Sequence, residues 1–258
     1  MTKPYLFILS LPILLIQIIP LFGNCQVPTV NSIYDANGKP AMLNGPNGKL
    51  YKIDFWTDPS EPSAEGNKAL VANCNDNHFT GKDRKVAKTS RVTKALYRSF
   101  VKISDIIHQL PSDNAMATQV TKTSPRITIE KKGVILDNAY LYAFKRESDN
   151  DYHLIIGDNQ DITKATLLNM EISGLPRPDN PDLDNSRIAF LSAFKINDKT
   201  CMSSYLVFVG NPVPIHVEGS VFYDIDHKPG TIGPVQGTLK LRPRTSWEVH
   251  PITNFSLR

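Results

Sequence analysis

The sequence predicts a mainly β protein whose C-terminal half is a five-stranded OB-like Greek-key barrel, with one helix between strands three and four. Three observations lead to this fold class. From residue 126 onward, apolar and polar residues alternate in short runs, which is the period of strands with one buried face. Turn-forming residues separate the runs. One segment instead repeats its apolar residues every three or four positions, as a helix does.

Five segments carry the strand pattern, and the first is long enough to form one bent strand. In chain order they are RITIEKKGVILDNAYLYAFKRE (126–147), DYHLIIGD (151–158), KATLLNMEISGLP (164–176), PIHVEGSVFYDIDH (214–227) and TSWEVHPITNFSL (245–257). The helix lies in RIAFLSAF, where Ile188, Leu191 and Phe194 share one face. Asp184, Asn185 or Ser186 is expected to cap its start. Strand, strand, strand, helix, strand, strand is the order of an OB-fold.

Residues 26–125 are predicted to be a loop-rich extension packed on the barrel domain, 126–258. A hairpin is expected around GKLYKIDFW (48–56), after several Asn-Gly turns. The segment 84–110 is basic and allows two interpretations. It forms either an amphipathic helix over about 90–109, with Val92, Leu96, Phe100 and Ile103 on one face, or a pair of strands.

Residues 1–25 have the pattern of a signal peptide, with Lys3 before an apolar run from Tyr5 to Phe22. We therefore expect a periplasmic or secreted protein with no stable transmembrane span in the mature chain. Lipoprotein anchoring at Cys25 and a retained N-terminal anchor are the alternatives. An exported chain meets oxidising conditions, so Cys74 and Cys201 are predicted to form a disulfide, with two free thiols as the alternative.

Three motifs in residues 126–258 are typical of one family. They are Asp149-x-Asp151-x-His153-Leu154, then Val217-x-Gly219 with Asp224 and His227, and finally Glu248-x-His250-Pro251. On these motifs the chain resembles a family of exported bacterial proteins whose members share an OB-like barrel, and the resemblance implies no particular reaction. The element order is also similar to that of staphylococcal-nuclease-like barrels, but that family's catalytic arginines and calcium-binding acids have no counterparts here.

The alternation also predicts which way the polar residues point. Leu154, Leu168, Met170, Trp247 and Val249 belong to the inward set, so their neighbours face outward. OB topology places strand three between strands two and five, so these outward residues are expected to share one exposed outer surface. The candidate site residues are His153, Glu171, Asp224, His227, Glu248 and His250.

Imidazoles and carboxylates on one face are what a divalent-metal site or an acid–base pair requires. Cross-strand pairing, or packing against residues 26–125, explains the same pattern without chemistry. The sequence contains no Gly-rich phosphate loop, nucleophile elbow, His-Glu-x-x-His or Cys-x-x-Cys motif, which argues against hydrolases of those types.

The loop between strands four and five contains Lys240, Arg242 and Arg244 and no acid, and such loops help OB-folds grip ligands. The chain's net charge of +4 permits an anionic partner, such as a polyanion, but does not require one. We therefore expect an exported protein that binds an unknown ligand or envelope component through the outer face of the barrel, without a cofactor. The alternative is a metal-dependent phosphodiesterase or nuclease with a His/carboxylate site on the same face.

Overall fold

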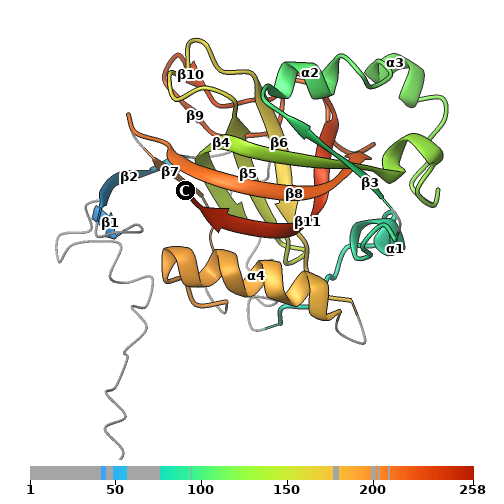
Figure 1. The fold of residues 1–258 in the computed structure, drawn as a ribbon, viewed down its shortest axis with the longest axis horizontal. Helices are drawn as coiled ribbons and strands as arrows, with labels where there is room; N and C mark the ends of the chain where they lie inside the picture. The colour runs from blue at the N-terminus through green and yellow to red at the C-terminus, as the bar shows by residue number, and fades with distance from the viewer. Residues whose placement is uncertain are drawn as a thin grey trace, which may run out of the picture.

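Five strands close a barrel in the computed structural model, which describes residues 42–44, 49–56, 76–93, 95–176, 180–198, 202, 204–208 and 210–258. Around the barrel the order is β4 (Lys132–Arg146), β5 (Tyr152–Gly157), β6 (Leu167–Ile172), β11 (Trp247–Leu257) and β8 (Val213–Tyr223), which pairs with β4 again. The β6–β11 pair is parallel, and the other pairs are antiparallel. Each barrel strand lies, to within one residue, in one of the five predicted segments, which confirms the mainly β, OB-like barrel (Figure 1).

The first barrel strand is long and bent, as predicted. β4 pairs with β8 along its first part and with β5 along its second. Its register shifts between Leu136 and Ala139 against β8, and between Leu141 and Ala143 against β5. Such irregularities bend a strand and increase its twist, so one strand serves both neighbours.

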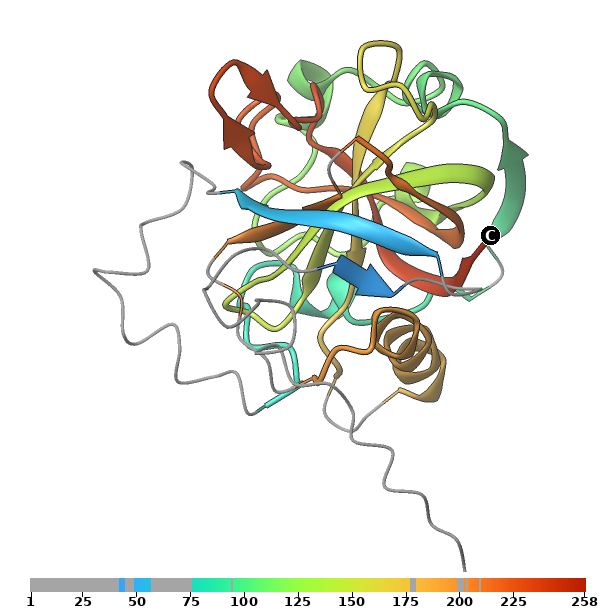
Figure 2. The same ribbon diagram turned by 90° about the vertical axis from the view of Figure 1, so that its left-hand side faces the viewer.

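The sheet continues beyond the barrel through residues of the N-terminal extension. β1 (Met42–Asn44) and β2 (Leu50–Trp56) form the predicted hairpin, and β2 pairs with β7 (Tyr205–Phe208). β7 in turn pairs with β4, so β2 runs alongside the barrel in Figure 2. The strand β7 was not predicted, because its four residues are too few to show a period.

The helix predicted over 90–109 is wrong, and so is the alternative of two paired strands. The segment contains α1 (Lys85–Lys88), β3 (Leu96–Phe100) and α2 (Ile103–Ile107), and β3 pairs in parallel with β4. Leu96, expected on the buried helix face, is 84% exposed. The tertiary pairing with β4 overrides the helical spacing.

The predicted helix between strands three and four is α4 (Pro181–Phe194). It begins before the predicted caps, because Pro181 suits the first helical position, and the Asp184 amide donates to the Asn180 carbonyl. Phe190 and Phe194 are buried against the ring of Phe144, whereas Ile188, predicted on the same face, is half exposed. The helix lies across one end of the barrel (Figure 1).

The other end of the barrel is covered by α2, α3 (Asp113–Met116) and the short 3-10 helix η4 (Thr128–Lys131). There Trp247 is 1% exposed, as predicted, and its Nε1 donates to the Pro111 carbonyl at 2.8 Å. The ring of Tyr223 packs edge-on against it. This aromatic contact closes the barrel interior.

We expect Trp247→Ala to lower the free energy of unfolding by about 3–5 kcal/mol, because it empties a large core site. Urea denaturation followed by circular dichroism measures the loss. Leu239→Ala, at a 42% exposed position, is the control and should change stability by less than about 0.5 kcal/mol. An equal effect of the two changes would contradict the burial of Trp247.

Residues 76–93 pack on the outside of the barrel. His78 forms a β-bridge with Leu175, and the Thr80 amide donates to the Asp149 carbonyl at 3.0 Å. Arg84 is 4% exposed and forms a buried ion pair with Glu130, with its Nη2 2.6 Å from Oε2. This segment therefore covers the face that was predicted to be open.

The structure does not test the predicted signal peptide or the predicted disulfide, and it bears on the membrane span only within the described residues. Residues 1–25, Cys74 and Cys201 lie outside the described residues, so the signal peptide and the disulfide stay predictions. Thiol labelling of the unreduced, unfolded protein tests the disulfide. Within the described ranges, no helix has the length and apolar character needed to span a bilayer.

Candidate functional site

The predicted polar residues share one face of the sheet, but that face is buried. His153, Glu171 and His250 are 0% exposed, Glu248 is 1% exposed and Asp224 is 2% exposed. The expectation of an exposed outer surface, and of Glu248 and His250 outside the core, is therefore wrong. The alternation was assigned correctly, but other segments lie over the face, including Lys88 beside Asp224 and Tyr205 beside His153. Strand alternation cannot reveal such cover.

The centre of the site is a row of three side chains on neighbouring strands. His153 of β5 stands directly opposite Glu171 of β6 in the register. In the parallel pair of β6 with β11, Glu248 aligns with Asn169, which brings His250 beside Glu171. The His250 Nδ1 lies 2.6 Å from Glu171 Oε2. Glu171 thus has an imidazole on each side.

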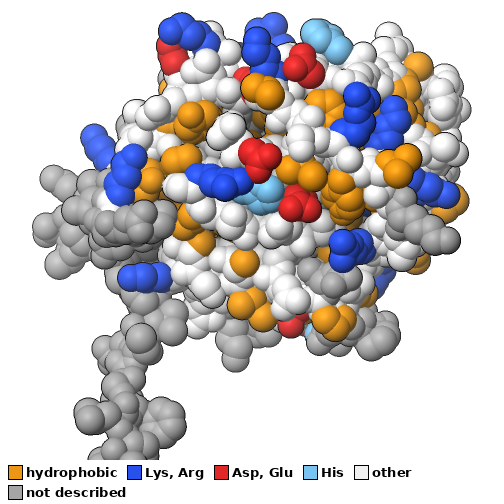
Figure 3. Space-filling model, in the orientation of Figure 1, with side chains coloured by type: hydrophobic (Ala, Val, Ile, Leu, Met, Phe, Trp, Pro, Cys, Tyr) orange, Lys and Arg blue, Asp and Glu red, His pale blue; other side chains and the backbone are white. Residues whose placement is uncertain are grey.

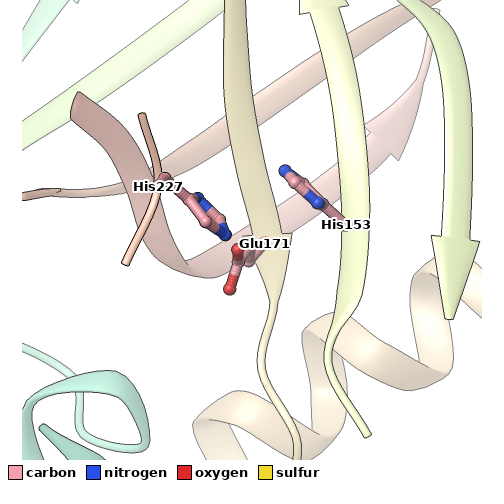
Figure 4. Close-up of side chains that lie close together, drawn as sticks. All are labelled: His153, Glu171 and His227. Atoms are coloured by element: carbon pink, nitrogen blue, oxygen red, sulfur yellow. The ribbon is translucent and has the colours of Figure 1, made fainter. Parts of the chain in front are cut away.

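A second group joins the row from the end of β8 and from β11. His227 Nδ1 lies 3.5 Å from Glu248 Oε2 and 3.9 Å from Asp224 Oδ2. The rings of His227 and His153 are stacked, with centroids 5.3 Å apart. Figure 4 shows His153, Glu171 and His227 converging from β5, β6 and the segment after β8. All six candidate residues therefore meet in one place, which we call the His/carboxylate cluster.

The cluster presents polar atoms that find no hydrogen bond among the described residues. Burying a polar atom without a partner costs about 1–3 kcal/mol, and native proteins leave few such atoms. A group of such atoms in one place is typical of a ligand-binding site. They include Asp151 Oδ2, His153 Nε2, Glu171 Oε1, Glu248 Oε2 and His250 Nε2.

His153 is held in an orientation that presents Nε2 to the cluster. Its Nδ1 lies 3.0 Å from Glu147 Oε1 and 3.0 Å from the Tyr205 hydroxyl. A carboxylate behind an imidazole fixes the ring and its tautomer in metal sites, so that the other nitrogen can bind the ion. Asp151 is fixed similarly, because its Oδ1 accepts from the Gly174 amide.

The charges in the cluster depend strongly on one another. Burial alone would lower the pKa of His227, but Asp224 and Glu248 outweigh it and raise the pKa to about 10. Burial and the carboxylate of Glu171 compete in the same way at His250, whose pKa is also about 10. Burial, with Asp149 nearby, raises the pKa of Asp151 well above its usual value. Without a bound cation, the protonated imidazoles of His227 and His250 balance the carboxylates beside them, and Asp151 favours its protonated form.

These pKa values predict how the stability of chelator-treated protein depends on pH. A folded-state pKa of about 10 at His227 and His250, against the usual 6.5, contributes stability that is fully present below about pH 6.5. That stability is lost as the pH rises toward 10. The melting temperature in EDTA should therefore fall between pH 6.5 and 9.5, and a flat or rising profile would contradict the prediction.

The donor set fits a divalent metal ion. Three groups have ligand atoms within 4.8 Å of one another: His153–Glu171–His227, Glu171–Asp224–His227–Glu248 and Asp151–Glu171–His250. Mixed imidazole and carboxylate ligands suit Zn²⁺, Mn²⁺ or Fe²⁺, whereas Ca²⁺ and Mg²⁺ prefer oxygen alone. The unpartnered atoms of His153, Asp151 and His250 belong to these groups.

Sequence reasoning missed three contributors to the site. Asp151 and Glu147 alternate with His153 along the chain, so the same period that selected His153 could have selected both. Lys88 of α1, whose Nζ lies 2.8 Å from Asp224 Oδ2, has no signal in its local sequence. Its position depends on how residues 76–93 pack.

The three predicted ligand-binding cations of the loop between β8 and β11 take no part in the contacts described for the cluster. Lys240 and Arg244 are exposed, and Arg242 donates through Nε to the Gly233 carbonyl at 3.1 Å within the loop. A cavity of about 270 Å³ beside this loop is lined by Leu239 and Leu241, but not by the three cations. In Figure 3, Lys and Arg side chains are scattered over the visible face among acidic and apolar ones.

The chain was also compared with known proteins. No protein-family model, no curated protein and no solved structure matches it.

Proposed function

We propose that the protein is an exported, divalent-metal-dependent hydrolase that acts on phosphodiesters. The observation that carries the proposal is the convergence of buried carboxylate and imidazole atoms on Glu171, several of them without a hydrogen bond among the described residues. Export rests on the signal-like pattern of residues 1–25.

A purely structural network would pair all its polar atoms, and this cluster pairs them only in part. Its imidazoles are backed by carboxylates, as metal-binding histidines are, while buried atoms such as His153 Nε2 and Glu171 Oε1 have no hydrogen bond among the described residues. These properties favour a ligand set over a packing device.

The cluster approaches solvent along one rim. Side-chain exposure is 15% at Glu147, 14% at His227 and 12% at Lys88, while the central residues are closed. A substrate would therefore approach past the Lys88 ammonium, which attracts a phosphate anion. The eight Lys and Arg between Lys82 and Lys102 add positive charge in the same part of the sequence.

A bound divalent ion supplies Lewis-acid polarisation of a phosphoryl oxygen and lowers the pKa of bound water. The chain's own residues hold and shield the reacting centre. Glu147 and Tyr205 orient His153, and Arg84 anchors the segment that excludes bulk water.

The direct test is hydrolysis of bis(p-nitrophenyl) phosphate and of a fluorescent single-stranded oligonucleotide. Protein loaded with Mn²⁺ or Zn²⁺ should cleave at least one of them, and EDTA should abolish cleavage. His216→Asn is the matched control, because His216 also pairs with carboxylates, Asp137 and Glu218, but outside the cluster. It should retain full activity.

The competing function is an exported binding protein without catalysis. It predicts that folded, metal-loaded protein binds the oligonucleotide or an acidic polysaccharide, in a salt-dependent way, without turnover. That result would overturn hydrolysis. Lys240, Arg242 and Arg244 would then be the candidate binding residues.

A further inference from the structure

We infer that the His/carboxylate cluster binds two divalent ions side by side, with Glu171 as the carboxylate they share. This inference rests on the metal site of the proposed function and adds its stoichiometry and ligand assignment. Two ions would hold a phosphoryl group between them, which is how many phosphoryl-cleaving sites are built.

The ligand groups divide into two sides around Glu171. Asp151 and His250 form one side, and His227 with Asp224 and Glu248 forms the other. Glu171 belongs to every group. Its Oε1 has no hydrogen-bond partner among the described residues, while its Oε2 lies 2.6 Å from His250 Nδ1. One oxygen thus faces the His250 side, and the other is open to an ion on the His227 side. His153 joins the His227 side through its free Nε2.

The distances within each side are those of atoms that bind a common ion. Asp151 Oδ2 and His250 Nε2 are 3.6 Å apart, and Glu248 Oε2 and His227 Nδ1 are 3.5 Å apart. Both separations are longer than the donor–acceptor distance of a good hydrogen bond. Two ligand atoms bound at about 2.1 Å to one tetrahedral ion lie about 3.4 Å from each other. On each side, the two ligand atoms are therefore already as far apart as two ligands of one metal ion.

The charge balance accommodates two ions. Six carboxylates lie in or beside the cluster, namely Glu147, Asp149, Asp151, Glu171, Asp224 and Glu248. Among the described residues, the nearby cations are Lys88 next to Asp224, Lys145 next to Glu147, and Arg126, which contacts the His250 carbonyl and interacts with Glu248. Six negative charges against three positive ones leave three when the imidazoles are neutral, as metal-bound imidazoles are. One divalent ion would leave one negative charge and two ions would leave one positive charge, which an anionic ligand would balance.

Metal content decides the inference without reference to activity. The protein is loaded with excess Mn²⁺ or Zn²⁺, freed of unbound ion by gel filtration and analysed by elemental mass spectrometry. We expect two ions per chain. The Mn²⁺ form should give an exchange-coupled electron paramagnetic resonance spectrum, because ions in such sites lie about 3.5–4 Å apart.

Two variants assign the sides. Asp151→Asn should lose the ion on the His250 side, and Glu248→Gln should weaken the ion on the His227 side, so each should retain about one ion and lose the coupled spectrum. His216→Asn should retain two. Near-ultraviolet circular dichroism checks that each variant is folded.

The outcomes separate this inference from the proposed function. One ion per chain in active wild-type protein overturns the shared site and leaves hydrolysis standing. Two coupled ions without turnover overturn hydrolysis and leave the shared site standing. No bound ion overturns both, and two ions retained in both variants overturn the assignment of ligands.

Discussion

Glu171→Gln should abolish metal loading and reduce phosphodiester hydrolysis by about 10²–10³-fold or more. Glu171 stands between His153 and His250 and belongs to every ligand group. The amide keeps the shape of the side chain but removes the charge that is proposed to hold the ions, and its N–H₂ is a donor where a ligand would be needed.

The same substitution should not unfold the chelator-treated protein. Although burial opposes the charged form, His250 and Lys88 hold the pKa of Glu171 well below its usual value, so glutamine removes a favourable charge contact. The melting temperature in EDTA should therefore fall, while the unfolding transition stays cooperative. The measurements are metal content, turnover and melting temperature in EDTA. Glu218→Gln is the matched control, because Glu218 also pairs with an imidazole, His216, on a part of the surface outside the cluster. Full metal loading of Glu171→Gln would refute the site as described.

Arg84→Met should lower the free energy of unfolding by about 3–5 kcal/mol, the usual cost of leaving one member of a buried ion pair alone. Arg84 contacts both oxygens of Glu130, at 2.7 and 2.6 Å, and stacks on Phe222 at 4.4 Å. It also donates to the Tyr223 and Ser124 carbonyls. Methionine replaces the apolar stem and none of these hydrogen bonds.

The loss should extend to the site, because Arg84 fixes the segment that carries Lys88 and covers the cluster. Urea denaturation gives the stability, and metal titration gives the affinity, which should fall with it. Arg98→Met, at an exposed arginine, should change neither. The double variant Arg84→Met/Glu130→Gln should recover part of the stability, because it removes the stranded charge. No recovery would show that the backbone contacts of Arg84 dominate.

The barrel and its strand faces could be read from the sequence because they depend on local periods. Alternation placed Leu154, Met170 and Trp247 in the interior and His153, Glu171 and His250 on the opposite face, and the structure agrees on both sets. The helix α4 followed from its 3.6-residue period, with its start shifted to Pro181. The order of the strands then predicted that His153, Glu171 and His250 would be neighbours.

The burial of that face could not be read from the sequence. It depends on segments far along the chain, among them β7 and residues 76–93, whose α1 has only four helical residues and shows no period. Their position depends on contacts with partners far along the chain, such as Arg84 with Glu130 and Lys88 with Asp224. Local spacing records which residues share a face, and only the tertiary contacts decide whether that face meets water. Here they turn a polar strand face into a buried cluster of carboxylates and imidazoles.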